Sequence, residues 1–155
     1  MDPRRRNIES GDRISQTSKQ HDTYKSGNRN PGNHSGAYDS LTFSYADFSG
    51  RGPLTGESAS AVKPDIVAPG VNVNTVSVGG GVAEFSGTSF ATPFVTGSAA
   101  LLMEWGIVRE NDIYLYGEKV KAYLRRGAKP MPGFEEYPNE AVGYGRLCLA
   151  ESIPD

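Results

Sequence analysis

Large apolar residues are distributed unevenly along the 155-residue chain. Residues 1–36 contain only Met1, Ile8, Ile14 and Tyr24, and the rest is rich in Arg, Asn, Ser, Gly, Lys and Gln. This segment shows neither a strand nor a helix period, and it has too little apolar surface to offset the cost of ordering. We therefore predict that residues 1–36 are a disordered or non-native N-terminal tail and that the globular part spans residues 37–155.

From residue 37 onward, short apolar runs alternate with turn residues, which is typical of strands. The pattern predicts strands within 41–48, 65–68, 71–78 and 82–85. Three consecutive glycines at 79–81 predict a flexible turn between the last two, and Pro69-Gly70 predicts a turn after the second. Together with the helices below, these runs indicate an α/β fold.

The best helix is predicted from about Phe90 to Trp105, where apolar and small residues occupy almost every side. We expect this helix to be buried on most of its surface and to end at Gly106. Proline is tolerated in the first turn of a helix. Pro93 therefore places the helix start only a few residues earlier, with Ser89 at the N-terminus.

A second helix is predicted from about residue 116 to 126, with Gly127 ending it. Val120, Tyr123 and Leu124 form its apolar stripe. A proline-containing loop over 130–138 and a turn over 142–149 leading to a short closing element complete the chain.

Bulk composition excludes several classes of function. The formal net charge is −2, which does not predict binding to nucleic acid or an anionic membrane. We expect no apolar segment to approach the roughly 20 residues of a membrane span, and no signal peptide is recognised, so the cellular location stays open. The single cysteine, Cys148, excludes an intramolecular disulfide, and its apolar surroundings predict a buried, inert thiol. No carboxylate cluster predicts a metal site, and no cofactor is expected.

Ser89 has two readings from its local sequence. A helix N-terminus offers free N–H groups and a positive dipole end, which suit the oxyanion of acyl transfer and therefore a nucleophilic serine. Alternatively, Ser89 or Thr88 is the N-cap of the helix, a role that both residue types favour. A Gly-Thr-Ser tripeptide alone would favour the cap.

The longer motif changes this balance. Residues 87–97 read GTSFATPFVTG, which resembles the active-site serine signature of the subtilisin-like serine proteases, the subtilases of peptidase family S8. That signature is Gly-Thr-Ser-x-Ala-x-Pro-x-Val-x-Gly, and every fixed position matches. The flanks at 45–52, 63–70 and 143–147 also resemble family segments, so the resemblance spans residues 37–155. In its sequence outside the fixed motif positions, the chain most resembles subtilases of Clostridia and related gut Firmicutes.

The resemblance implies the C-terminal part of a subtilase catalytic domain: a partial three-layer α/β fold with a mostly parallel sheet and a buried helix after the serine. It also implies a Ser–His–Asp triad with an oxyanion asparagine. Ser89 is the one catalytic residue that carries over, with its N–H as an oxyanion donor. His21, His34 and Asp39 do not fit the family motifs. Ser26-Gly27-Asn28 fits the Ser-Gly-Asn pattern of the oxyanion asparagine only superficially, because its surroundings differ from those of the family.

We therefore expect a serine endopeptidase by family, acting on peptide or protein substrates, but present as a fragment that is inactive alone. The alternative is a non-catalytic remnant or pseudoenzyme that binds a partner or complements a separate N-terminal chain. In either case the N-terminal part of the catalytic domain is a candidate partner.

Overall fold

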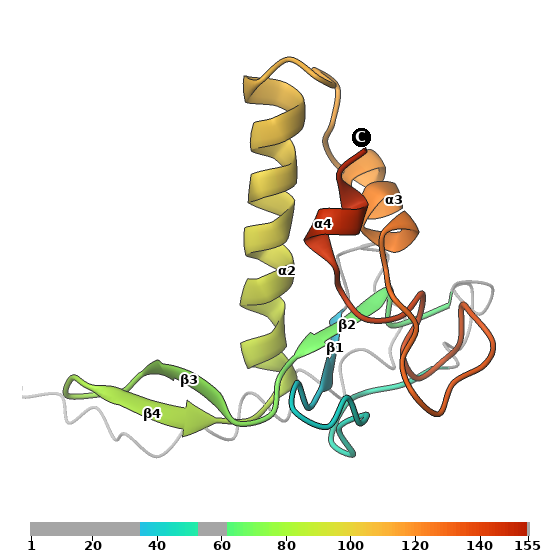
Figure 1. The fold of residues 1–155 in the computed structure, drawn as a ribbon. Coiled ribbons are helices and arrows are strands. Elements are labelled where there is room, and N and C mark those ends of the chain that lie inside the picture. Colours follow the sequence, from blue (N-terminus) through green and yellow to red (C-terminus); the bar gives the residue numbers. More distant parts are fainter. Residues whose placement is uncertain (1–34, 53–61, 155) are drawn as a thin grey trace, which may run out of the picture.

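The structure is a computed structural model, and it describes residues 35–52 and 62–154 (Figure 1). The predicted tail, residues 1–36, lies almost wholly outside this range, so it stays a prediction. The described elements are, in chain order, β1 (Ser35–Tyr38), β2 (Ile66–Pro69), β3 (Val73–Val76), β4 (Val82–Phe85), α2 (Thr88–Met103), η2 (Glu104–Val108), α3 (Glu118–Arg126) and α4 (Leu149–Ser152).

A small parallel sheet lies at the base of the molecule. Strand β1 pairs with β2 in parallel, with Ser35 opposite Ile66 and Tyr38 opposite Pro69. Residues 145–147 run along the other edge of β2: the Val67 N–H donates to the Gly145 carbonyl at 3.0 Å, and the Leu147 N–H donates to the Val67 carbonyl at 2.8 Å. The predicted strand at 65–68 is thus confirmed, and it is fully buried because it is bonded on both edges.

Strands β3 and β4 form an antiparallel hairpin that projects away from the rest of the chain (Figure 1). Val73 pairs with Phe85 and Val76 with Val82, and the turn at 77–81 is closed by a 3.1 Å hydrogen bond from the Ser77 N–H to the Gly81 carbonyl. The predicted strands and glycine turn are confirmed, although the first strand is shorter than expected. The described elements therefore show a mixed α/β fold with one parallel and one antiparallel sheet.

The predicted strand at 41–48 is wrong. Its first half forms a tight turn, in which the Asp39 carboxylate accepts a 2.9 Å hydrogen bond from the Leu41 N–H and Phe43 adopts a φ of 55°. Only Tyr45 pairs with a strand, through an isolated antiparallel bridge to Tyr38. The apolar alternation was misleading because the aspartate offered the backbone a local turn instead of a ladder.

The long helix continues past its expected end. Helix α2 passes at Met103 directly into the π-helical segment η2, so Gly106 lies inside a helix and does not terminate it. A Cβ added to Gly106 would lie 2.9 Å from the Leu115 Cβ and 3.0 Å from the Asp112 carbonyl oxygen. The glycine is therefore needed for the close approach of the following loop, not for a C-cap.

The second predicted helix is confirmed as α3, and Gly127 follows it as expected. Ser152 of α4 packs directly against Gly127, leaving no space there for a side chain. Cys148 precedes α4 and is half-buried, so its predicted burial is only partial. Helices α3 and α4 lie together on one side of α2 (Figure 1).

The core lies where α2 meets the sheet and the two shorter helices. Its buried members are Ala37, Ala46, Ile66, Ala68, Ala91, Val95, Leu102, Leu115, Val120 and Leu124. Helix α2 contributes only Ala91, Val95 and Leu102 to this core, which form a single stripe. The prediction that this helix is buried on most sides is therefore wrong for the described residues.

The same helix is long and apolar enough, by length and composition alone, to cross a membrane. The segment Thr88–Val108 has 21 residues, a mean hydropathy of 1.2 and a window that is 22% buried. The expectation that no segment approaches this length was wrong. The core helix of a soluble protein meets the same criteria, so the finding by itself does not indicate a membrane span.

Candidate active site

Ser89 is placed by two backbone hydrogen bonds that connect the start of α2 to the parallel sheet. The Gly70 N–H donates to the Tyr38 carbonyl at 3.0 Å, and the Gly87 N–H donates to the Gly70 carbonyl at 2.8 Å. The C-terminal end of β2 thus holds the residue that immediately precedes α2. The position of Ser89 therefore follows from the end of the sheet, a common place for functional groups in α/β folds.

Ser89 is the second residue of α2 and does not cap it. Gly87 occupies the N-cap position, and no side chain bonds to the free N–H groups of this end. The Ser89 side chain is exposed, and its hydroxyl has no hydrogen-bond partner within residues 35–52 and 62–154. The interpretation of Ser89 or Thr88 as the N-cap of the helix is therefore wrong. The Ser89 hydroxyl is free to act as a nucleophile or to bind another group.

Pro93 lies inside α2, two residues deeper than expected, because the helix begins at Thr88 and not at Phe90. Proline has no N–H, so the Ser89 carbonyl lacks the donor that a helix normally supplies four residues later. The adjacent turn is supported differently: the Thr92 hydroxyl donates to the Thr88 carbonyl at 3.0 Å and contacts the Ser35 hydroxyl at 3.3 Å. This contact joins the start of α2 to the start of β1.

Gly70 allows the sheet and the start of α2 to touch. A Cβ built on Gly70 would lie 2.6 Å from the Ala37 Cβ, 2.9 Å from the Gly87 carbonyl oxygen and 3.3 Å from the Ala91 Cβ. The first two approaches are below 3.0 Å and so too short for van der Waals contact, whereas the third is only slightly tight. The sequence indicated a turn at Pro69-Gly70 but gave no sign of this contact, which depends on the tertiary arrangement.

A side-chain clasp closes the base of the β3–β4 hairpin just before Ser89. The Asn72 N–H donates to the Ser86 hydroxyl at 2.9 Å, and that hydroxyl lies 3.3 Å from the Asn72 Oδ1. The Phe85 and Phe90 rings, which flank residues 86–89 in the sequence, stack on each other with their centroids 5.3 Å apart. These contacts fix both ends of the segment that carries Ser89.

Of the other catalytic candidates, only Asp39 lies among the described residues. His21, His34 and Asn28 lie outside the described residues. Asp39 is engaged in its own turn, where the Leu41 N–H lowers the pKa of its carboxyl group. Within the described part of the chain no group of acidic, histidine or cysteine side chains could hold a metal ion.

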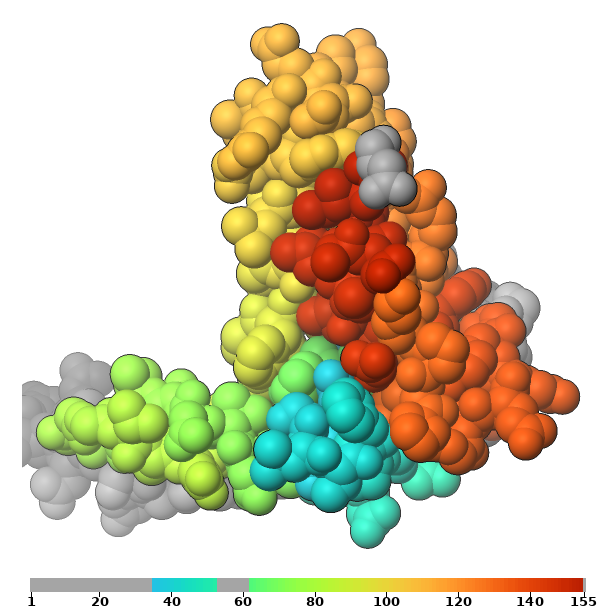
Figure 2. Space-filling view, in the orientation of Figure 1, coloured from blue at the N-terminus to red at the C-terminus, as the bar shows by residue number. Residues whose placement is uncertain are grey.

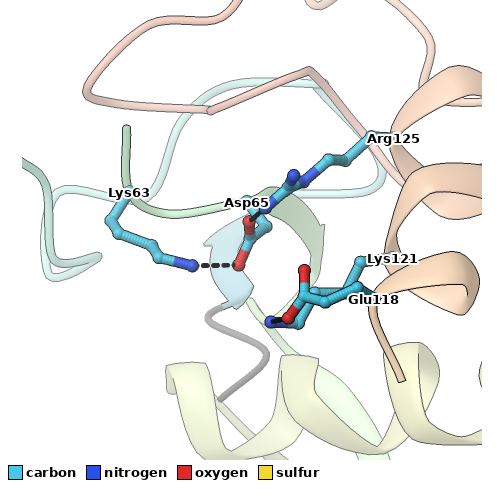
Figure 3. A network of polar contacts seen from close by, with 5 residues as sticks. All are labelled: Lys63, Asp65, Glu118, Lys121 and Arg125. Carbon is cyan, nitrogen blue, oxygen red and sulfur yellow. Dashed lines mark hydrogen bonds and ion pairs between the residues drawn. The ribbon is translucent and has the colours of Figure 1, made fainter. Parts of the chain in front are cut away.

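A buried charge network, which sequence reasoning missed, lies at the entry to β2 (Figure 3). The Asp65 side chain is only 6% exposed and pairs with Lys63 at 2.6 Å and with Arg125 of α3. Burial alone would raise the pKa of the Asp65 carboxyl, but hydrogen bonds and charges from Lys63 and Arg125 outweigh burial and lower it. This network joins α3 to the strand that positions the Ser89 loop. The sequence feature that could have predicted this network is Asp65, an acidic residue directly before the apolar strand.

The sequence of this chain matches the subtilase family (Peptidase S8) over residues 26–145. The match begins at Ser26, inside the predicted tail, and so takes in Asn28.

Individual relatives agree with this match. A PII-type proteinase of Lactococcus lactis subsp. cremoris is 40% identical over 76 residues, covering 49% of this chain and 4% of the relative. The membrane-bound transcription factor site-1 protease of Mus musculus is 37% identical over 107 residues, covering 67% of this chain and 10% of the relative. The chain thus spans a small part of the length of these proteins.

Among solved structures, the Clostridium perfringens CspB protease superimposes with a TM-score of 0.70 at 46% identity, covering 76% of this chain and 24% of that chain. The self-cleaved protease domain of PatA superimposes with a TM-score of 0.56 at 32% identity, covering 76% and 38% respectively. The described elements match part of the subtilisin fold, and the family match covers most of the sequence. This chain belongs to the subtilase family.

Proposed function

We propose that this chain contributes the nucleophile, Ser89, to a serine endopeptidase whose catalytic site is completed by the upstream part of a subtilase domain. The observation that carries the proposal is the geometry of Ser89: an exposed hydroxyl without a partner among the described residues, at the first turn of a long helix. It stands within a full match to the family's serine signature. The substrate class implied by the family is a peptide or protein.

Each group in this chain would have a defined role in acyl transfer. The Ser89 Oγ would attack the scissile carbonyl, and the Ser89 N–H, free of any backbone partner in the described residues, would donate to the oxyanion. The hydroxyl proton must pass to a base, which the family supplies as a histidine oriented by an aspartate. Neither motif is recognised in this sequence, so the chain alone should be inactive. In subtilisin itself, loss of the catalytic histidine costs on the order of 10⁶ in turnover.

The second candidate is a non-catalytic remnant that binds a partner. It is favoured by one observation: both histidines of the sequence lie outside the family's His-Gly-Thr pattern. The two candidates both predict an inactive isolated chain but different behaviour when the upstream part of a subtilase domain is supplied.

A fluorophosphonate probe distinguishes them, because labelling requires an activated serine. We expect little labelling of the isolated chain and labelling at Ser89, mapped by peptide mass spectrometry, when the upstream part is present. Ser89→Ala should abolish the signal. Ser40→Ala, at an exposed serine in the 39–44 turn, is the matched control and should label like the unmodified chain. Absence of labelling in the assembled pair would refute the catalytic proposal and support the remnant.

A further inference from the structure

The β3–β4 hairpin is linked to the start of α2 at its root. Figure 2 shows the hairpin projecting sideways from the base of the helix. The ladder between the two strands ends at the pair Val73–Phe85. One residue farther, the Asn72 N–H donates to the Ser86 hydroxyl at 2.9 Å, and this hydroxyl donates to the Asn72 Oδ1 at 3.3 Å. A side chain thus forms the rung that follows the last backbone rung.

The backbone of Asn72 explains why a side chain is used there. Its φ of 50° lies in the left-handed region. Asparagine is one of the few residues besides glycine that adopt this conformation without a large cost. A left-handed residue interrupts the extended backbone that a ladder requires. The residue type at position 72 and the hydroxyl at position 86 therefore serve the same link.

The next residue, Gly87, joins this link to the turn that carries the serine. The Gly87 N–H donates to the Gly70 carbonyl at 2.8 Å, and the Gly87 carbonyl accepts a 3.0 Å hydrogen bond from the Phe90 N–H. Ser89 lies inside the turn that this second bond closes. Release of the Ser86 side chain would leave the Gly87 N–H at the frayed end of the hairpin, where backbone hydrogen bonds open most easily.

We propose that Asn72 and Ser86 are positioning residues for the nucleophile, and that their clasp holds the turn of residues 87–90 against the end of β2. The inference rests on the proposed function for the role of Ser89, whereas the clasp itself belongs to this chain alone. The Ser89 hydroxyl must face the scissile carbonyl while its N–H faces the oxyanion. A displacement of about 1 Å in such a site costs a rate of about 100-fold.

Packing of the core does not account for the clasp. The Asn72 and Ser86 side chains are both exposed, and neither residue belongs to the hydrophobic core of the described part of the chain. The effect of losing the clasp should therefore fall on the adjoining turn.

Hydrogen exchange of the Gly87 amide, measured by NMR in the full 155-residue chain, tests the clasp without any partner. Ser86→Ala removes both hydrogen bonds and should speed this exchange about tenfold. Ser86→Thr keeps the hydroxyl and should exchange like the parent. Ser44→Ala is the matched control, because the exposed Ser44 hydroxyl is also hydrogen-bonded to a nearby side chain, that of Thr42, at 2.7 Å. It should leave the Gly87 exchange unchanged.

The rate of fluorophosphonate labelling tests whether the clasp positions Ser89. The chain is co-expressed with the portion of the C. perfringens CspB protease that precedes its matched segment, and the purified pair is labelled. Ser86→Ala should label Ser89 at least about tenfold more slowly than the parent, whereas Ser86→Thr and Ser44→Ala should label at the parent rate. Because the rate is measured on the assembled pair, a loss of stability alone would lower the yield and not the rate.

Each result decides a different part of the proposal. Equal Gly87 exchange in the Ser86→Ala and Ser44→Ala variants would overturn the clasp. Faster exchange in Ser86→Ala with an unchanged labelling rate would overturn its positioning role, and recovery of both rates in Ser86→Thr would support it. If the parent pair is never labelled, the proposed function fails, and the exchange rates alone then decide whether the clasp holds the turn.

Discussion

Gly70→Ala should destabilise the chain because the new methyl group would collide with three parts of the site. The built Cβ lies 2.6 Å from the Ala37 Cβ and 2.9 Å from the Gly87 carbonyl oxygen. Carbon atoms pack best at about 3.5–4.0 Å, so the first contact is about 1 Å too short. Overpacking of this kind costs about 1–3 kcal/mol. The relief requires β1 to separate from the start of α2, which would also displace the residue that precedes the serine turn.

Gly97→Ala is the matched control, since the same methyl group there meets nothing and should stabilise the isolated chain by about 0.5–1 kcal/mol. The two variants should therefore differ by about 1.5–4 kcal/mol in free energy of unfolding. Urea unfolding, followed by fluorescence of Trp105, the single tryptophan, measures this difference. Equal midpoints for the two variants would refute the argument that Gly70 is required by close packing.

Two further perturbations test contacts away from the serine. Asp65→Asn removes the carboxylate held by Lys63 and Arg125 and should cost about 3 kcal/mol at pH 7, as for a broken buried ion pair. Because folding lowers the Asp65 pKa, its stabilisation is present above the unfolded pKa of about 3.9 and is lost as the pH falls through the folded value; urea midpoints of the variant and parent should converge in acid. Gly106→Ala should cost about 1–3 kcal/mol in the same assay, because its Cβ would contact Leu115, and an unchanged midpoint would contradict that contact.

Elements with a clear local signal could be predicted from sequence. The helix with Val120, Tyr123 and Leu124 on one face, the strand before Pro69-Gly70 and the glycine turn of the hairpin are all found in the structure. Each depends on periodicity or turn chemistry within a few residues. The predicted strand at 41–48 failed because local turn chemistry at Asp39 outweighed the apolar alternation, whereas other errors depended on distant contacts.

Gly106 shows why. Its place after an apolar run is typical of a glycine that ends a helix, yet Gly106 lies inside η2. Leu115 and the Asp112 carbonyl pack so closely against it that a side chain would not fit. A glycine that permits close approach and one that ends a helix look identical in the sequence. The same limit applies to Ser89, because the motif gave its identity, whereas its placement at the end of the sheet depends on Gly70 and Gly87.

The helix after Ser89 gives the most instructive disagreement. Its composition predicted burial on nearly every side, and the described residues bury only the stripe of Ala91, Val95 and Leu102. An apolar residue left at 53% exposure, such as Leu101, gives the chain only part of the stabilisation of a fully buried leucine, and an interior glycine costs some. A sequence that keeps both residues on the helix surface is therefore consistent with contacts beyond those made by the described residues. The composition of the helix and its observed exposure would agree if the upstream part of a subtilase domain, proposed above to complete the catalytic site, also packed against this helix.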